Sequence, residues 1–442
     1  MMQCRCFGWL SVFLGLASPL AAADWPQWMG PARDGVWKET GIVEKIPEEG
    51  LKVLWRVPVG GGYSGPAVVG DRVYLTDYQK TSGNITNNPG SRDELTGEER
   101  VLCLDAKTGD ILWKHAYDRP YKLSYPCGPR ATPTVDGNLV FTLGAEGNLW
   151  ALNAQTGEVV WAKDLVKEFS APVPIWGFSG HPLVDGSKLI CLVGGKGSVA
   201  VAFDKTTGKE LWRALTASES GYAPPSIIEA AGVRQLLIWD ADKLSALNPE
   251  TGEVYWSQDL KPSYGMAIMA PRKEGDLLFA GGIGGVAATF RLNQEKPGAE
   301  VVWRGDSSKG VFPANMTPII DDGTMYAVDC QQGALRGVRL ADGKRLWQSF
   351  APITGGKRGA NHGTVFLVRH TPDYFLFNEL GDLIQAKLSP TGYEEIGRFH
   401  VLEPSQTVFG REVVWSHPAF ANRALYARND KELVCVSLAA EK

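Results

Sequence analysis

The feature that most constrains the fold is an internal repeat that ends in tryptophan. Four times the chain carries Asp or Asn, any two residues, Thr and Gly, with a Trp four residues after the Gly; the first copy is Asp105–Gly109 with Trp113. Asp and Asn side chains bond to nearby backbone, and Gly adopts the left-handed conformation, so each copy predicts a tight turn between two antiparallel strands. Such self-similarity is typical of repeat architectures, in which each unit packs on its neighbours.

A second hairpin precedes each of these turns, so the repeating unit has four strands. Pro66–Leu75, with its turn at Gly70, is the clearest example. Three further tryptophans keep the spacing from a Gly to within one residue, and successive tryptophans of the series are 44 to 58 residues apart. This is the period of a β-propeller blade. We expect the series to fill the space between adjoining sheets: Trp55, Trp113, Trp161, Trp212, Trp256, Trp303 and Trp347.

Counting the units gives a closed ring of eight blades. The first six blades follow one another from Pro66 to Trp347, and each ends at a repeat tryptophan. A degenerate seventh covers 361–399, and the last begins at His417 with only three strands. Residues 51–56 would supply its missing outer strand and leave no open edge. The sequence therefore predicts an all-β, eight-bladed propeller with four-stranded antiparallel blades, the last closed by the N-terminal strand. The expected organisation is a signal peptide (1–23), a leader segment (24–50) and the propeller (51–442).

The first 23 residues are typical of a secretory signal peptide. Arg5 precedes an apolar run, and Ala21–Ala23 fits a cleavage site. A membrane anchor is the alternative, but the run is shorter than the ~20 apolar residues of a span and contains Pro19. No Cys stands at the end of the apolar run, and Cys4 and Cys6 lie before it, so no lipid-attachment site is expected. We expect a periplasmic or secreted protein without a transmembrane segment in its mature chain.

Composition excludes one class of partner. Lys and Arg total 45 against 49 Asp and Glu, a net charge of −4, and no dense basic run occurs, so we expect no nucleic-acid partner. The cysteines after the signal peptide show no CxxC or metal-ligand spacing. Cys103 and Cys435 fall in a repeat position otherwise occupied by small residues, which indicates packing. We expect a monomer with no bound metal.

The repeat Gly-x-Leu-x-Ala-Leu-(Asp/Asn)-x-x-Thr-Gly-x-x-x-Trp resembles the PQQ-like β-propeller repeat. That repeat is found in quinoprotein alcohol dehydrogenases and in the scaffold subunit of the outer-membrane β-barrel assembly machine, and the resemblance covers nearly the whole mature chain. It implies either a PQQ cofactor with calcium in the central channel or a non-catalytic scaffold. Such dehydrogenases typically carry an adjacent Cys pair over the cofactor, whereas no two cysteines are adjacent here, and the scaffold's lipid-attachment Cys is absent. The leader 24–35 and the segments 415–420 and 427–433 look like those of exported PQQ-like propellers of unassigned activity.

One face of the predicted ring carries the longer loops. In a four-stranded blade, the loops between strands 2 and 3 and the connections between blades share one face, which we call the long-loop face. Its long segments are 114–131, 162–180, 349–360 and 400–416, with a polar insertion at 77–100. Long loops on a rigid scaffold usually carry function.

Histidines and aromatic residues converge near the predicted mouth of the channel. His181, His362 and His417 share one repeat position, at the start of the innermost strand. One metal bound by all three is not expected, because blades 3 and 7 stand opposite each other in an eight-bladed ring. Nearby residues could bind a sugar, a quinone or a peptide, or could pack the loops instead. They are Tyr63, Arg130, Trp176, Phe178, Tyr222, Tyr264, Asn315, Arg358, Asn361 and Trp415.

Three functions are compatible with this pattern. The first is a binding or scaffolding propeller that holds a protein or glycan on its long-loop face, and we favour it because a complete structural repeat lacks a recognisable catalytic constellation. The second is a periplasmic oxidoreductase of alcohols or sugars with PQQ and calcium, which no specific motif supports. The third is a glycan-cleaving enzyme that uses channel His and Tyr residues. No catalytic residue is assigned.

Overall fold

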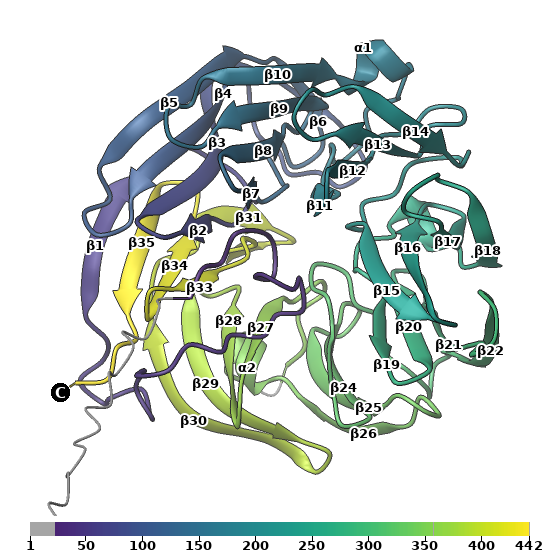
Figure 1. Cartoon of the computed structure of the whole chain (residues 1–442). Coiled ribbons are helices and arrows are strands. Elements are labelled where there is room, and N and C mark those ends of the chain that lie inside the picture. The colour runs from purple at the N-terminus through teal and green to yellow at the C-terminus, as the bar shows by residue number, and fades with distance from the viewer. Residues whose placement is uncertain (1–22, 357, 442) are drawn as a thin grey trace, which may run out of the picture.

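The chain folds into a closed ring of eight antiparallel sheets. The structure is a computed structural model and describes residues 23–356 and 358–441. In each of the first seven sheets the chain enters at the strand nearest the axis and leaves at the outer strand (Figure 1). The predicted eight-bladed propeller with four-stranded blades is therefore confirmed. Nearly all of the predicted signal peptide lies outside the described residues.

The strands follow the repeat along the chain. Blade 1 contains β2 (Ala67–Val69), β3 (Arg72–Ser82), β4 (Asp93–Asp105) and β5 (Ile111–Asp118), with β6 (Tyr121–Leu123) beside β4. Blade 2 contains β7 (Thr134–Asp136), β8 (Leu139–Leu143), β9 (Asn148–Asn153) and β10 (Val159–Asp164). Blade 3 contains β11 (Leu183–Asp185), β12 (Lys188–Leu192), β13 (Ala200–Asp204) and β14 (Glu210–Ala214). Blade 4 contains β15 (Ser226–Ala230), β16 (Val233–Trp239), β17 (Lys243–Leu247) and β18 (Val254–Asp259).

The second half repeats this order. Blade 5 contains β19 (Arg272–Glu274), β20 (Leu277–Gly282), β21 (Val286–Leu292) and β22 (Ala299–Arg304). Blade 6 contains β23 (Ile319–Asp321), β24 (Thr324–Asp329), β25 (Ala334–Arg339) and β26 (Arg345–Ser349). Blade 7 contains β27 (Val365–His370), β28 (Asp373–Asn378), β29 (Asp382–Ser389) and β30 (Gly392–His400). Blade 8 contains β33 (Ala419–Ala421), β34 (Ala424–Arg428), β35 (Glu432–Ser437) and β1 (Val53–Pro58).

The two ends of the chain close the ring together. Strand β1 pairs antiparallel with β35, with Trp55 opposite Cys435. The purple β1 accordingly lies against the yellow β35 in Figure 1. Backbone hydrogen bonds between distant parts of the sequence thus complete blade 8, as predicted, and the ring has no open gap between its first and last blades.

Six of the seven repeat tryptophans connect their blade to the next one through a hydrogen bond. Trp113 of blade 1 donates its Nε1–H to the carbonyl of Ala154, in the turn after β9 of blade 2, at 3.1 Å. The same bond recurs from Trp55 to Ala106, Trp161 to Lys205 and Trp212 to Pro249. Trp256 instead donates to Gln235 Oε1 of its own blade.

The glycine of each Asp/Asn-x-x-Thr-Gly turn lies directly against the tryptophan of the preceding blade. Gly157 has φ +75°, and a Cβ there would lie 2.5 Å from Cε3 of Trp113. We expect Gly157→Ala to lower the free energy of unfolding by roughly 2 to 4 kcal/mol, from left-handed strain and overpacking together. Gly137→Ala, at φ +58° with nothing within 4 Å, is the control and should cost about 1 kcal/mol. Urea denaturation measures the free energy of unfolding of both variants. An equal loss in the two variants would contradict the close contact between Gly157 and Trp113.

Short helices and one extra hairpin lie on the connections between blades. They are α1 (Leu165–Phe169), the 3-10 helix η1 (Ser263–Gly265), α2 (Ala351–Thr354) and the hairpin of β31 (Gln406–Val408) and β32 (Arg411–Val413). Within residues 23–356 and 358–441, no helix has the length and apolar character needed to cross a membrane.

Candidate functional site: the channel and the long-loop face

The leader occupies the central channel of the ring. Trp25 exchanges two backbone hydrogen bonds with Val68 of β2, and Trp37 N–H donates to the carbonyl of Arg369 on β27. Between these two points the dark purple segment crosses the middle of the ring in Figure 1. Trp25, Trp28, Met29 and Trp37 are each at most 6% exposed. Residues 24–37, which the sequence left without a role, therefore contribute these four side chains to the core, and we call them the channel segment.

Trp28 brings two of the predicted histidines together. Its indole stacks on His181 with ring centroids 5.0 Å apart, and meets His417 edge-on at 6.0 Å. Its Nε1–H donates to His417 Nε2 at 3.4 Å. The two imidazoles lie 6.4 Å apart although they belong to blades 3 and 8, because both side chains project toward the axis. His362 lies elsewhere, on the long-loop face.

Burial keeps this histidine pair neutral. It lowers the pKa of His181 well below the ordinary value, with the charges of His417 and Arg33 as smaller causes, and lowers the pKa of His417 to about 3. Thr132 N–H donates to His181 Nδ1 at 2.8 Å. His181 Nδ1 and His417 Nε2 thus each accept a hydrogen bond with their ring lone pair. A metal bound at either nitrogen would need that same lone pair.

Acid should destabilise the fold through this pair. A histidine whose pKa falls on folding contributes stability above its unfolded pKa of ~6.5, and that stability is lost as the pH drops toward the folded value. The folded pKa of His417 is about 3, so we expect this residue to lower the free energy of unfolding by about 2 kcal/mol between pH 7 and pH 5. Chemical denaturation at both pH values should therefore show a smaller loss in His417→Gln. An identical pH dependence in the two proteins would contradict the buried neutral state.

Two arginines complete the enclosure of Trp28. The guanidinium carbons of Arg33 and Arg272 lie 5.4 and 5.8 Å from the indole centroid. Arg33 also donates to the carbonyls of His181 and Pro182, which fixes the channel segment to the start of β11. Desolvation by burial lowers the pKa of Arg33 to about 9 and that of Arg272 to about 10. Both remain cationic at neutral pH.

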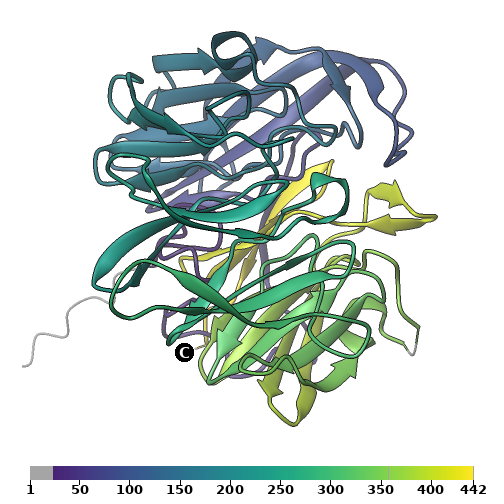
Figure 2. The same cartoon turned by 90° about the vertical axis from the view of Figure 1, so that its right-hand side faces the viewer.

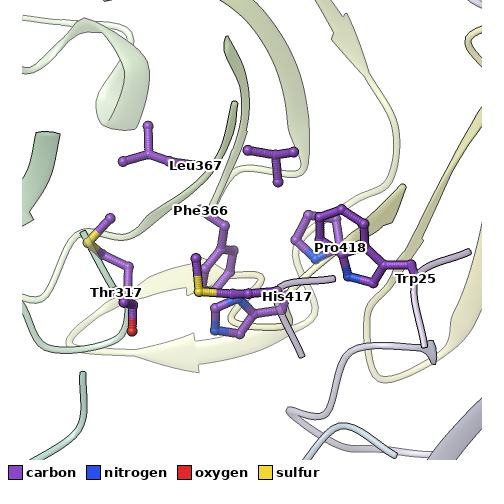
Figure 3. A pocket seen from close by; sticks show the side chains of 9 residues that line it. Trp25, Thr317, Phe366, Leu367, His417 and Pro418 are labelled. Atoms are coloured by element: carbon purple, nitrogen blue, oxygen red, sulfur yellow. The ribbon is translucent and has the colours of Figure 1, made fainter. Parts of the chain in front are cut away.

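The space left beside His417 is very small. The cavity there has a volume of about 10 Å³ and is shown in Figure 3. A water molecule needs at least ~10–15 Å³ by the same measure, and ligand pockets usually have ~300–1,000 Å³. The cavity holds one water at most. It is lined by Trp25, Met29, Met316, Thr317, Phe366, Leu367, Val368, His417 and Pro418.

The predicted aromatic residues of the mouth meet in pairs on the long-loop face. Trp176 lies 5.7 Å from Tyr222, measured between ring centroids. Trp415 lies 6.1 Å from Tyr125 and donates its Nε1–H to Glu379 Oε2 at 3.3 Å. One small apolar cluster contains Tyr125 and, from the β31–β32 hairpin, Val408 and Val413, with Tyr63, Trp176 and Trp415 packed against it.

The polar residues predicted for the mouth have several different environments. The Arg130 guanidinium lies 5.0 Å from the Tyr63 ring centroid and donates to loop carbonyls. His362 stacks on Phe409 of the β31–β32 turn at 5.0 Å. Asn315 donates to Thr364 Oγ1 at 3.1 Å. Arg358 and Asn361 are exposed at the rim.

The polar insertion in blade 1 extends the same face. Figure 2 shows the blue-purple ends of β3 and β4 and the yellow β31–β32 hairpin projecting on one side of the ring. Asn87 donates to the carbonyl of Thr407 at 3.0 Å, and Ser124 Oγ donates to the carbonyl of Asn88 at 2.7 Å. The insertion therefore connects loops of blades 1, 2 and 8, a role that its sequence did not indicate.

The donor set of the channel does not fit a PQQ–calcium site. The described residues contain no group of three or more His, Cys, Asp and Glu side chains that converge as metal ligands. Trp28 and its neighbours fill the axis, and the one-water cavity is far smaller than a tricyclic quinone requires. The five cysteines within the described residues are buried free thiols and supply no disulfide above the channel.

The ring and its repeat define a PQQ-like β-propeller. The sequence matches, over residues 97–349 and 240–441, the profile of the PQQ-like family described as outer membrane protein assembly factor BamB. The chain belongs to this family. Among solved structures, quinohemoprotein alcohol dehydrogenase from Comamonas testosteroni matches 95% of this chain and 81% of its own, with a TM-score of 0.59 and 13% identity, and so shares the fold.

Curated relatives have different activities. Outer membrane protein assembly factor BamB of Yersinia pestis is 25% identical over 228 residues, which cover 49% of this chain and 55% of that protein. Tetrathionate hydrolase of Acidithiobacillus ferrooxidans is 24% identical and covers 72% and 64%. Quinoprotein alcohol dehydrogenase PedH of Pseudomonas putida is 34% identical over 137 residues, covering 29% and 22%. The chain thus spans less than two thirds of the length of each of these relatives.

Proposed function

We propose that this protein is a binding or scaffolding propeller that holds a protein or glycan ligand on its long-loop face. One observation carries the proposal: Trp28 of the chain's own leader fills the channel between His181 and His417. A ligand must then bind outside the axis. The long-loop face carries the β3–β4 insertion, the β31–β32 hairpin and the paired aromatic residues, as expected of function built on loops of a rigid scaffold.

Partner and compartment follow from the same proposal. Relatives named as outer membrane protein assembly factors support a protein partner in the bacterial envelope. Export through the predicted signal peptide would bring this chain to the periplasm or the outside of the cell. The ring would act there as a monomer with one binding face.

A quinone-dependent oxidoreductase is the second candidate. It is favoured by the 34% identity with the dehydrogenase PedH over 137 residues. PQQ would supply two-electron oxidation of an alcohol or sugar when bound. It would need the volume that Trp28 and Met29 occupy, so this function requires the channel segment to leave its place.

Variants on the two faces test the binding proposal. The mature chain is titrated against a panel of soluble oligosaccharides and purified envelope proteins. We expect a ligand whose affinity falls at least tenfold in Trp415→Ala and in His362→Ala. Lys107→Ala, an exposed change on the turn after β4 at the opposite face, is the control and should bind normally. A ligand that is lost only in Lys107→Ala would place binding on the wrong face and contradict the proposal.

A further inference from the structure

A second hollow lies on the long-loop face, away from the channel mouth. It lies where the connections on either side of blade 4 meet, and its volume is about 470 Å³. This volume falls within the ~300–1,000 Å³ that is usual for small-molecule sites. It is lined by Ser218, Glu219, Ala241, Lys261, Pro262, Ser263, Tyr264 and Gly265.

Tyr264 presents its ring to solvent from a strained backbone. The residue is 77% exposed, with φ 59° and ψ 24° in η1. The left-handed conformation costs an L-residue roughly 1–2 kcal/mol, and such strain is concentrated at ligand clamps and active sites. Within the described part of the chain, the Tyr264 side chain forms no hydrogen bond and no aromatic pair. Packing of the fold therefore does not account for this ring.

Asp242 fixes the two loops that form the walls. Its carboxylate accepts hydrogen bonds from Ser218 N–H at 2.8 Å and from Ser218 Oγ–H at 3.1 Å. It also pairs with Lys261 Nζ at 3.0 Å. The hydrogen bond from Ser218 N–H is the main cause that holds the pKa of Asp242 below its usual range. The Asp242 carboxylate is therefore ionised at neutral pH. The hollow is thus built before any ligand arrives.

Glu219 supplies a free acceptor beside the ring. Within the described residues its carboxylate forms no ion pair or side-chain hydrogen bond. A Cβ at Gly265 would lie 3.1 Å from Glu219 Oε2, so the glycine keeps this wall of the hollow clear. Glu219 can therefore accept hydrogen bonds from a ligand, and Ser263 Oγ lies on the same lining.

These groups together select a class of ligand. One flat aromatic face, one carboxylate, one paired ammonium and two hydroxyls match a neutral molecule with many hydroxyls and one C–H face. The π face of an aromatic ring carries partial negative charge and attracts such C–H groups. An anionic polymer is disfavoured, because no excess of positive charge lines the hollow.

We propose that this hollow binds a pyranose ring of a neutral glycan, with Tyr264 stacked on the sugar face and Glu219 accepting a sugar hydroxyl. The inference goes beyond the proposed function, because it assigns a second binding site on the long-loop face, for a glycan, that Trp415→Ala and His362→Ala should leave intact. Tyr264 is the residue that separates this inference from a site at the channel mouth, where Trp415 and His362 lie.

The test combines glycan binding with stability. The full mature chain is titrated calorimetrically with cellohexaose, maltohexaose and chitohexaose. We expect at least one to bind, with affinity at least tenfold lower in Tyr264→Gly and about fivefold lower in Glu219→Gln. Because glycine removes the strain, Tyr264→Gly should unfold at an equal or higher urea concentration than the parent. Ala231→Gly, which relieves φ +54° on the opposite face, is the matched control and should bind normally.

Each other outcome has a defined meaning. If no oligosaccharide binds, or if binding survives in Tyr264→Gly, the glycan inference is overturned. Loss of binding in Trp415→Ala alone would move the site to the mouth and leave the proposed function in place. Binding of a purified protein that is lost in Tyr264→Gly would replace the glycan with a protein ligand. Stoichiometric binding of PQQ would instead overturn the proposed function itself.

Discussion

Deleting residues 24–40 from the mature chain is expected to cost the propeller much of its stability. The deletion removes Trp25, Trp28, Met29 and Trp37, all nearly inaccessible to solvent. At about 1.5–3 kcal/mol for each large apolar side chain buried, the loss is roughly 6–12 kcal/mol, which is comparable with the whole stability of many domains. Thermal and urea denaturation, followed by tryptophan fluorescence, measure the change.

A point variant keeps this prediction testable if the truncated chain does not fold. Trp28→Ala leaves the rest of the channel segment in place and should cost about 3–5 kcal/mol, because it opens a cavity between two imidazoles and two guanidinium groups. Pro31→Ala, at an exposed position of the same segment, should change little. If the truncated chain and the Trp28→Ala chain both keep the denaturation midpoint of the parent, the channel segment is not part of the core.

The second large effect is expected at the base of the blade 1 insertion. Asp77 is fully buried, and its carboxylate accepts hydrogen bonds from Arg100 Nε at 2.8 Å and from Gly60 N–H at 2.5 Å. Asp77→Ala leaves the Arg100 guanidinium without its carboxylate, and breaking a buried pair in this way usually costs about 3–5 kcal/mol.

The same insertion offers the matched comparison. Glu94 pairs with Lys122 at 2.7 Å, but both side chains are about 70% exposed. Exposed pairs of this kind add little, so Glu94→Ala should leave the denaturation midpoint unchanged. Equal midpoints for the Asp77 and Glu94 variants would contradict the structural role of the buried pair.

The architecture could be predicted because its signals are local. The Asp105–Gly109 turn and its four homologous or shortened copies each set one hairpin, and the distance to the following Trp sets the strand length. Even blade 7, which lacks the Trp, keeps an alternating strand at Asp382–Ser389. The closing strand was visible as an orphan without a hairpin partner in sequence. Turn chemistry and strand alternation were sufficient for these elements.

The role of the channel segment could not be predicted in this way. Its partners Val68, His181 and Arg369 lie on three different blades and come together only after the ring closes. No periodic pattern in residues 24–37 indicates such contacts. The proximity of His181 and His417 was missed for the same reason, since ring position alone places blades 3 and 8 apart.

The candidate glycan hollow shows a different limit of sequence reasoning. The sequence grouped Tyr264 with the residues near the channel mouth, but it lines a separate hollow, and its left-handed backbone and its 77% exposure are properties of the fold. Glu219, Asp242 and Lys261 belong to three separate connections, and ordinary loop composition gave no sign that they would meet. Only the spatial arrangement shows that the Asp242 carboxylate is hydrogen-bonded and paired while the Glu219 carboxylate is free to bind a ligand.

The most direct test of a channel filled by the chain's own leader is a titration of the purified mature chain with PQQ in the presence of calcium. Tryptophan fluorescence, cofactor absorbance and melting temperature are followed together, since a ligand that binds the native state raises the melting temperature. We predict no saturable binding and no shift, because Trp28 and Met29 occupy the axis. One-to-one binding, a raised melting temperature and dye-linked oxidation of an alcohol or sugar would contradict the account.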